Sequence, residues 1–289
     1  MFEGFEYERV ATSGATIAVR HAGRGPAVLL LHGFPQTHVI WHAIAPRLAQ
    51  HYSVVCPDLR GYGDSSKPAT DDRHTPYSKR AMAQDQLALM HALGFERFAV
   101  VGHDRGGRCA YRLALDHPAH VRALSVLDII PTYEHFQRTN AAFALGYFHW
   151  FFLAQRHDLP ERLIAADPDA FFLRGGAKLF HPDALAEYRR AFHDPATIHA
   201  MCEDYRAAAG IDCELDEADK LARRRIGCPV QALWGKRSGV DRWYDVLAVW
   251  REWADRVEGH AIDCGHFLPE EAPDETYTAI KDFLDHAPP

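Results

Sequence analysis

The sequence predicts an α/β domain with a mostly parallel sheet that is interrupted by a helical insertion. Short apolar runs alternate with helix-like segments before residue 131 and again after residue 221, which is typical of parallel strands joined by helices. Between these regions, residues 131–221 hold helical and aromatic segments but no convincing strand. We therefore expect a core formed by residues 1–130 and 222–289, with a helical cap of residues 131–221 inserted between its halves.

Each core element follows from a local pattern. Alternation of apolar and polar residues around Ser13-Gly14 predicts an antiparallel hairpin of residues 5–10 and 16–21. Continuous apolar runs predict buried strands, and helical segments separate them. The strands are expected at residues 28–31, 53–56, 98–101, 123–127, 230–234 and 260–262. The helices are expected at residues 41–50, 78–93, from the end of the 98–101 run to about 117, near 243–253, and through 283.

Composition and charge exclude several classes of function. The net charge is −7 without any acidic or basic block, which argues against nucleic acid or an anionic membrane as partner. The amino terminus lacks a signal-peptide pattern, no stretch approaches 18 apolar residues, and the six cysteines show no metal-like spacing. The pairs His38/His42 and His117/His120 lack a third ligand. We expect a cytoplasmic protein with reduced thiols that needs no metal and no cofactor.

The central motif is Gly102-His103-Asp104-Arg105-Gly106, between the strand at 98–101 and a helix. This strand–turn–helix context is that of the nucleophile elbow G-x-S-x-G, with aspartate in place of serine. Glycines at both ends fit a sharp turn in which backbones approach closely. The alternative is a loop aspartate that only caps the following helix.

Four motifs together resemble the α/β-hydrolase superfamily. They are His-Gly-Phe-Pro at 32–35, Asp-Leu-Arg-Gly-Tyr-Gly at 58–63, the elbow at Asp104, and Gly-His-Phe at 265–267. Their order and spacing span nearly the whole core, and the nucleophile precedes the histidine as in that superfamily. The resemblance makes His266 the catalytic base, whereas His103 is expected to pack beneath the turn.

The third member of the triad follows one of two strands in this superfamily. After the later strand, residues 234–238 read Trp-Gly-Lys-Arg-Ser, with serine where aspartate is usual. After the earlier strand, Asp128 stands at the strand end. Asp128 is therefore the predicted acid that orients His266 and stabilises its imidazolium, with Asp241 and Asp263 as alternatives.

An aspartate nucleophile changes the expected reaction. Attack of a carboxylate on an ester would form an anhydride, whereas attack on an sp³ carbon with a leaving group forms an alkyl ester that water can hydrolyse. That water should attack the carboxyl carbon of Asp104, so its oxygen enters Asp104 first. Backbone N–H groups of Phe34 and Arg105 are candidates for the oxyanion hole. Dehalogenation and epoxide opening both fit this chemistry.

Arg105 and Arg108 share one face of the first turn of the elbow helix. Each cation opposes the helix dipole there at a cost of roughly 0.3–1 kcal/mol, so a countercharge is expected. A substrate carboxylate is the predicted countercharge because arginine binds it bidentately. The alternative for Arg108 is pairing with a cap acid or with solvent.

With both arginines in place, the elbow, Leu-Asp-Ile-Ile-Pro-Thr at 127–132 and the pair His149-Trp150 resemble the haloacetate dehalogenases, the fluoroacetate dehalogenases in particular. This resemblance implies that His149, Trp150 and a tyrosine, best matched by Tyr205, bind the departing halide, and it implies a homodimer. Each charge-assisted hydrogen bond is worth roughly 1.5–3 kcal/mol, so three donors in a dry pocket would stabilise fluoride. Without the resemblance, this aromatic stretch indicates core packing.

The predicted function is hydrolysis of a 2-haloacid such as fluoroacetate to the hydroxy acid and halide. One alternative is an epoxide hydrolase with the same nucleophile, which would act on uncharged epoxides and be indifferent to loss of Arg108. The other is a non-catalytic receptor for a small acid, which would bind without turnover. Residues 171–185 of the cap look short and basic, with Arg174 and Lys178, so the substrate range is left open.

Overall fold

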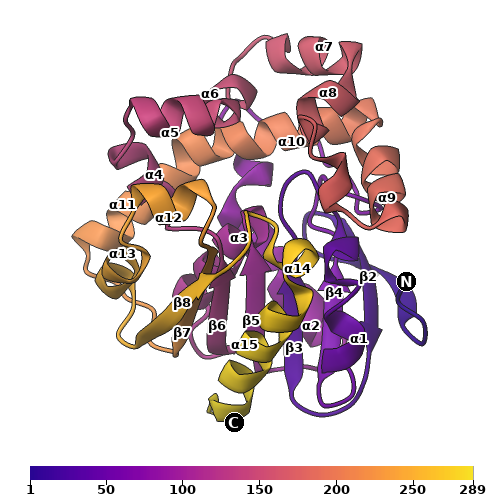
Figure 1. Cartoon of the computed structure of the whole chain (residues 1–289), viewed down its shortest axis with the longest axis vertical. Coiled ribbons are helices and arrows are strands. Elements are labelled where there is room, and N and C mark those ends of the chain that lie inside the picture. Colours follow the sequence, from indigo (N-terminus) through magenta and orange to yellow (C-terminus); the bar gives the residue numbers. More distant parts are fainter. Residues whose placement is uncertain (289) are drawn as a thin grey trace.

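The structure, a computed structural model, describes residues 1–288 and contains one eight-stranded sheet in the order β1-β2-β4-β3-β5-β6-β7-β8 (Figure 1). The pairs β1–β2 and β2–β4 are antiparallel, and every other neighbouring pair is parallel. The predicted α/β class with a mostly parallel sheet is confirmed. The strands are β1 (Glu6–Ala11), β2 (Thr16–Ala22), β3 (Ala27–Leu31), β4 (Ser53–Pro57), β5 (Phe98–His103), β6 (Val121–Leu127), β7 (Val230–Gly235) and β8 (Val257–Ile262).

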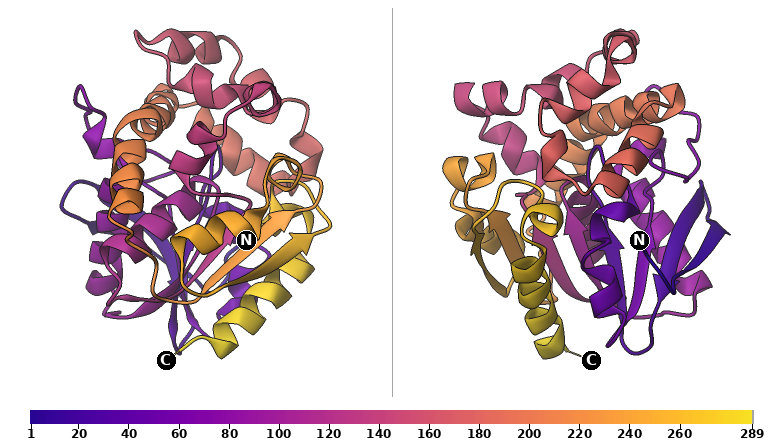
Figure 2. Two further views of the ribbon diagram at one scale, coloured as in Figure 1. Left: turned by 90° about the vertical axis from the view of Figure 1, so that its left-hand side faces the viewer. Right: turned by 45° about the vertical axis from the view of Figure 1, so that its right-hand side comes forward.

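Helices cover both faces of the sheet, and alternate strand residues pack on opposite sides (Figure 2). In β3, Leu29 and Leu31 belong to one apolar cluster while Val28 and Leu30 belong to the other. The first cluster includes residues of α2 (Lys79–Ala92), α3 (Arg105–Asp116) and α13 (Val246–Trp253). The second includes residues of α1 (Ala45–Leu48), α14 (Leu268–Glu271) and α15 (Pro273–His286). This double cover explains why the central strands are continuous apolar runs.

Between β6 and β7 the described chain forms only helices, and they lie over the end of the sheet where α3 begins (Figure 1). This cap contains α4 (Thr132–Gln137), α5 (Ala141–Gly146), α6 (Phe148–Leu153), α7 (Leu159–Ala166), α8 (Pro168–Leu173), α9 (Pro182–Phe192), α10 (Pro195–Ala207) and α11 (Cys213–Leu221). A π-helical turn, Ala208–Asp212, joins α10 to α11.

Two expected helices are each broken in the structure. The segment 41–50 forms a 3₁₀ turn, His38–Trp41, and then α1, because Pro46 has no N–H to continue a single helix. The segment 243–253 forms α12 (Gly239–Trp243) and α13, separated by Tyr244 in an extended conformation. The Asp245 side chain accepts a hydrogen bond from Ala248 N at 3.0 Å and starts α13.

All six cysteines are free, four of them buried. Among the described residues, no helix has the length and apolar character needed to cross a bilayer.

Candidate active site

Asp104 lies at the sharp turn between β5 and α3, with a positive φ of 43°. Such a conformation costs of order 1–3 kcal/mol in a non-glycine residue and is typical of functional sites. The flanking glycines are needed because a Cβ on Gly102 would lie 2.6 Å from the Gly106 oxygen, and one on Gly106 would lie 2.3 Å from the His32 oxygen. The turn therefore holds the carboxylate at the carboxyl end of the central strand.

The surroundings of Asp104 keep its carboxylate ionised. Burial alone would raise its pKa, but positive charge at His266 and Arg108 outweighs burial and lowers it below the ordinary value. Phe34 N donates to Asp104 Oδ2 at 3.2 Å, and Arg108 Nε lies 4.0 Å from Oδ1. The Phe34 N–H expected in the oxyanion hole thus already contacts the nucleophile's own oxygen.

His266 and Asp128 are brought together although 138 residues separate them. His266 Nδ1 lies 2.6 Å from Asp128 Oδ2. Burial would lower the histidine's pKa, but the hydrogen bond and charge of Asp128 raise it above the ordinary value. The other oxygen of Asp128 accepts from Gly235 N at 3.0 Å and Ser238 Oγ at 2.7 Å, so both oxygens of this buried acid are used.

The two alternative acids are engaged elsewhere. Asp241 accepts from Trp234 Nε1 at 2.7 Å, and the exposed Asp263 pairs with Arg237. Ser238, which occupies the place where the superfamily usually has aspartate, donates to Asp128 instead. Sequence reasoning missed this supporting contact.

His103 is buried under the turn, as expected. Its Nε2 lies 2.8 Å from the backbone oxygen of His266, and the two rings are 4.7 Å apart. Burial lowers the pKa of His103 to about 3, so the ring is neutral. It supports the loop that carries His266.

Arg105 already has a countercharge within the protein. Its Nε donates to Asp204 Oδ2 at 2.9 Å, and its Nη2 donates to Asp204 Oδ1 and to the Asp204 backbone oxygen. The remaining nitrogen, Nη1, is buried without a partner. A cap acid therefore neutralises Arg105, and one of its N–H groups is left free for a ligand.

Asp204 lies on α10 and joins the cap to the core. Besides Arg105, it accepts from Tyr62 OH at 2.8 Å and from Lys79 Nζ. Burial would raise its pKa, but the charges of Arg105 and Lys79 hold the pKa well below its ordinary value. The sequence shows an acid next to Tyr205, but not its partners. Arg105, Lys79 and Tyr62 are 99, 125 and 142 residues away from Asp204.

Replacing Asp204 by alanine is expected to lower the free energy of unfolding by about 3–5 kcal/mol, because two buried cations lose their carboxylate. Chemical denaturation measures this value. Asp263→Ala is the matched control, since Asp263 and Arg237 form an exposed pair and its loss should cost no more than about 1 kcal/mol. Equal stability of the two variants would contradict the assigned role of Asp204.

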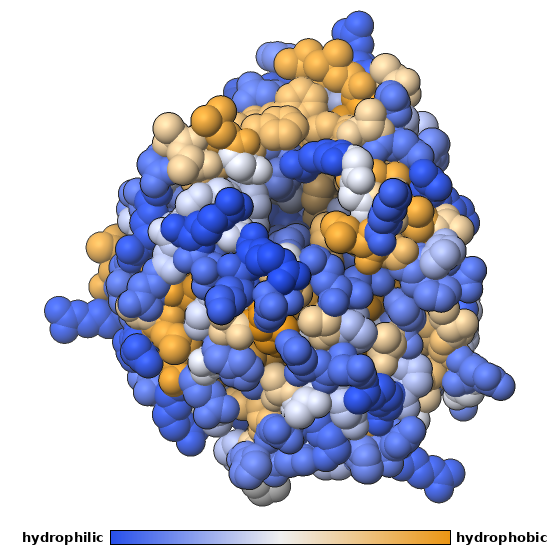
Figure 3. Space-filling model, in the orientation of Figure 1, coloured by the Kyte–Doolittle hydropathy of each residue, from blue (hydrophilic) through white to orange (hydrophobic). Residues whose placement is uncertain are grey.

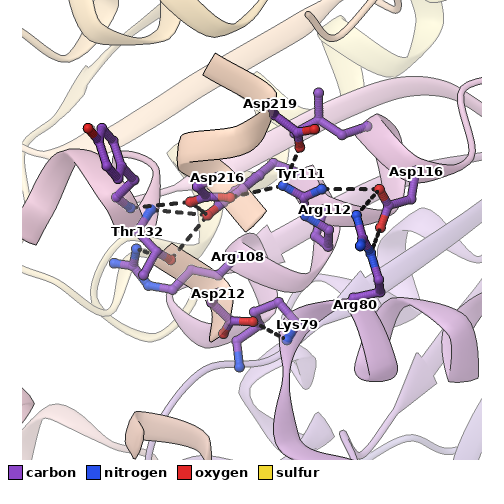
Figure 4. A network of polar contacts seen from close by, with 12 residues as sticks. Lys79, Arg80, Arg108, Tyr111, Arg112, Asp116, Thr132, Asp212, Asp216 and Asp219 are labelled. Carbon is purple, nitrogen blue, oxygen red and sulfur yellow. Dashed lines mark hydrogen bonds and ion pairs between the residues drawn. The ribbon is translucent and has the colours of Figure 1, made fainter. Parts of the chain in front are cut away.

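Arg108 joins the core–cap network of Figure 4 through Thr132. Its Nη1 donates to the Ile130 oxygen at 3.0 Å and lies 3.3 Å from Thr132 Oγ1. Tyr111, next to Thr132, donates to Asp216 of α11 at 2.6 Å. Arg108 Nε, however, is buried without a partner beside Asp104. Like Arg105, it is fixed by the protein and still has an N–H group to offer.

The three residues expected to bind halide lie together above Asp104. The Tyr205 ring is 5.7 Å from that of His149 and 5.9 Å from that of Trp150. Tyr205 Oη and His149 Nδ1 are buried without hydrogen-bond partners. Burial and the charge of Arg174 lower the pKa of His149 well below its ordinary value, so the ring is neutral. Trp150 covers Arg108 and Tyr205 covers Arg105, at 4.4 and 4.3 Å.

A cavity of about 290 Å³ opens onto Asp104 and His266. Arg105, Arg108 and Tyr205 are not in its lining, but all three contact the ring of Trp150, which is part of it. The other lining residues come mostly from the cap and are largely apolar, and sequence reasoning had singled out few of them. They are Phe34, Pro35, Gly146, Tyr147, His149, Trp150, Phe172, Leu173, Arg174, Gly176, Leu179 and Phe267.

Groups of side chains that could bind a metal lie away from this cavity in the described part of the chain. They are His91/Glu96/His120, Glu6/Glu8/His21 and Glu161/His199/Glu203, and none includes a residue of the cavity lining. In the third group, Arg206 already pairs with both glutamates.

The site therefore combines an ionised carboxylate, a histidine oriented by a buried acid, and unpartnered donors around an apolar cavity. A carboxylate can attack a saturated carbon and form an ester, and the histidine can activate water to cleave that ester. The free N–H groups of two fixed arginines suit an anionic substrate.

Known proteins are similar to this chain over most of its length. The model of the alpha/beta hydrolase fold matches residues 26–273. A fluoroacetate dehalogenase from Burkholderia sp. is 47% identical to this chain. The alignment covers 99% of this chain and 96% of the dehalogenase. A soluble epoxide hydrolase from Corynebacterium sp. is 36% identical and covers 91% of both chains. The solved structure of ALR0039 from Nostoc sp. PCC 7120 is 56% identical in sequence and superposes with a TM-score of 0.96. The match covers 99% of this chain and 100% of the ALR0039 chain. The chain belongs to the α/β-hydrolase fold family and, within this family of enzymes, to the haloacetate dehalogenases.

Proposed function

We propose that this enzyme hydrolyses 2-haloacids such as fluoroacetate to the 2-hydroxy acid and halide. The observation that carries the proposal is a pair of buried arginine nitrogens without hydrogen-bond partners, Arg105 Nη1 and Arg108 Nε, the second of which lies 4.0 Å from Asp104 Oδ1. An unsatisfied buried donor on a charged group is costly, and a substrate carboxylate would satisfy both. Neutral substrates would leave both donors unpaired.

In the first step, Arg105 and Arg108 hold the carboxylate while Asp104 attacks the carbon that bears the halogen. The carbon–halogen bond breaks as the ester bond forms, and the halide leaves as an anion. Donors at His149, Trp150 and Tyr205 receive it within an apolar pocket, where such hydrogen bonds are strongest.

In the second step, His266 takes a proton from water, and the water oxygen attacks Cγ of Asp104. Asp128 orients His266 and stabilises the imidazolium that forms. The Phe34 N–H, 3.2 Å from Asp104 Oδ2, is placed to stabilise negative charge on that oxygen. Cleavage of the ester releases the hydroxy acid and restores Asp104.

The test is halide release from fluoroacetate and chloroacetate, with Arg108→Gln measured beside the wild type. Release of both ions, with a KM that rises at least about tenfold in Arg108→Gln, supports the proposal. Chloride without fluoride keeps the mechanism but counts against the three-donor halide pocket. Release of neither ion counts against the proposal as a whole.

A second candidate function is epoxide opening, which has one observation in its favour. Tyr147, in the cavity lining, and Tyr205, which packs on the lining residue Trp150, both have buried hydroxyls without partners, and an epoxide oxygen needs an acid of this kind. The 36% identical relative is named an epoxide hydrolase. Turnover of an uncharged epoxide that is unaffected by Arg108→Gln would favour this function over dehalogenation.

The pH dependence of kcat should show an acid limb with a midpoint above 6.5, the ordinary histidine pKa. Asp128 raises the pKa of His266, and only neutral His266 can accept the proton of water, so activity falls as pH drops through this raised value. The pKa of Asp104 is lowered, so it stays ionised over this range. Because carbon–halogen cleavage precedes the histidine's role, the limb should be weaker in kcat/KM. A kcat that is flat from pH 8 to 5 would contradict this reading.

The homodimer and the cytoplasmic location are further proposals. The dimer rests on family resemblance. Large apolar side chains are also exposed on the cap, part of which is visible in Figure 3. Five of them are Leu145, Phe148, Leu159, Leu163 and Leu179. Light scattering of the purified protein would test the dimer.

A further inference from the structure

The hydroxyl of Tyr147 has no role in the reaction proposed above. Tyr147 lies just before α6 and lines the cavity together with Asp104 and His266. Its oxygen is buried and has no hydrogen-bond partner. The ring is fixed by an edge contact with Trp243 at 4.9 Å and a stacked contact with Trp150 at 6.4 Å. A buried hydroxyl without a partner is costly, so a ligand or a water molecule is expected there.

The two unpartnered cap tyrosines lie against different parts of the site. The Tyr205 ring covers the Arg105 guanidinium at 4.3 Å, on the side that would hold the substrate. The Tyr147 ring instead meets the His266 ring edge-on, with centroids 6.3 Å apart. Burial raises the pKa of both hydroxyls. Among charges, Asp128 affects Tyr147 most, whereas Asp104 affects Tyr205 most. The Tyr147 ring also lies 5.4 Å from the His149 ring, so Tyr147 stands between the expected halide donors and the base and, of the two tyrosines, is the one in contact with His266.

The second step needs a water molecule between His266 and Cγ of Asp104. His266 Nδ1 is used by Asp128, so Nε2 is the nitrogen that takes the proton. The water directs one proton at Nε2 and a lone pair at Cγ, which leaves its other proton in need of an acceptor. The neighbouring ring Phe267, 5.0 Å from His266, cannot supply one, but a tyrosine hydroxyl oxygen can.

We propose that Tyr147 positions the hydrolytic water and acts in the second step only, an inference that rests on the proposed function. Water forms a bond to Cγ of Asp104, one proton passes to His266 Nε2, and the other proton remains hydrogen-bonded to Tyr147 Oη. The ester bond between Cγ and the substrate oxygen then breaks. That oxygen takes the proton from His266 and leaves as the hydroxy acid, and the proton that remains on the new Cγ hydroxyl is released to solvent, which restores the Asp104 carboxylate.

The experiment is rapid-quench measurement of chloride release from excess chloroacetate by Tyr147→Phe, with Tyr205→Phe as matched control. Tyr147→Phe should release its first chloride per subunit at the wild-type rate and then turn over roughly tenfold more slowly. Intact-protein mass spectrometry during turnover should show more protein carrying one carboxymethyl group than in the wild type. Tyr205→Phe should instead slow the first chloride and accumulate no ester.

Three results would overturn the inference. If Tyr147→Phe slows the first chloride, the hydroxyl serves the leaving group, and if neither phase changes, it serves no step. A lower melting temperature in Tyr147→Phe would assign the hydroxyl a structural role, since loss of a partnerless hydroxyl should not destabilise the fold. If the wild type releases no halide at all, the proposed function itself has failed.

Discussion

Halide release is expected to fall by roughly 10⁴-fold or more when Asp104 is replaced by asparagine. The reaction needs a negatively charged oxygen at the tip of the elbow, and an amide is a poor nucleophile of nearly the same shape. Positive charge at His266 and Arg108 outweighs burial and lowers the pKa of Asp104, which favours its charged form. The measurement is fluoride and chloride release over time by purified Asp104→Asn.

The control for this variant is Asp263→Asn. Asp263 also follows a core strand but pairs with exposed Arg237, so activity should remain within about twofold of the wild type. Substrate binding to Asp104→Asn should persist, because neither arginine depends on Asp104 for its fixed position. Substantial halide release by Asp104→Asn would mean that another group attacks the carbon.

The fold could be predicted because it depends on local patterns, and one rule of topology predicts that Asp104 and Asp128 are neighbours, whereas the roles expected of Asp128 and His266 came from the resemblance to a known superfamily. Parallel strands end at the same edge of the sheet, so the residues just after β5 and β6 lie close together. This places Asp128 near Asp104 from sequence alone. His266 follows β8, and its 2.6 Å contact with Asp128 agrees with the same rule. Gly102 and Gly106 are recognisable in the sequence because the sharp turn leaves no room for a Cβ at either position.

The environment of the arginines could not be predicted, because it depends on how the cap packs on the core. Sequence reasoning expected a substrate carboxylate to balance Arg105, whereas Asp204 of α10 already does so. Pairing with a cap acid was the alternative expected for Arg108. In the structure such an acid, Asp204, pairs with Arg105 instead. No local periodicity reports a contact between residues that are 99 positions apart.

The environment of the Tyr147 hydroxyl could not be predicted from the sequence either. Its sequence context is an aromatic stretch that favours core packing, and its ring does pack against Trp150 and Trp243. Its hydroxyl, however, is buried without a hydrogen-bond partner, and this follows from the way the cap packs over the sheet. A hydropathy pattern therefore gives no signal for a single polar atom, such as this hydroxyl, on a packed aromatic residue.

Replacing His266 by asparagine should separate the two chemical steps. Asp104, the arginines and the halide donors remain, so the first halide should still be released, about one per subunit. Hydrolysis of the ester should then slow by roughly 10³-fold, because no base is left to take the proton of water. The expected product is a stable protein with one carboxymethyl group on Asp104, which peptide mass spectrometry would locate.

This result would distinguish a role of His266 in carbon–halogen cleavage from a role in ester hydrolysis, since the geometry alone allows both. A histidine that acted in the first step would leave the variant without any halide release. The contact of His266 with Asp128 at 2.6 Å, and the raised pKa that follows, argue instead for a group that receives a proton during ester cleavage. Since Asp128 keeps Gly235 and Ser238 as partners, the variant should fold, and its trapped ester would name Asp104 as the nucleophile by direct observation.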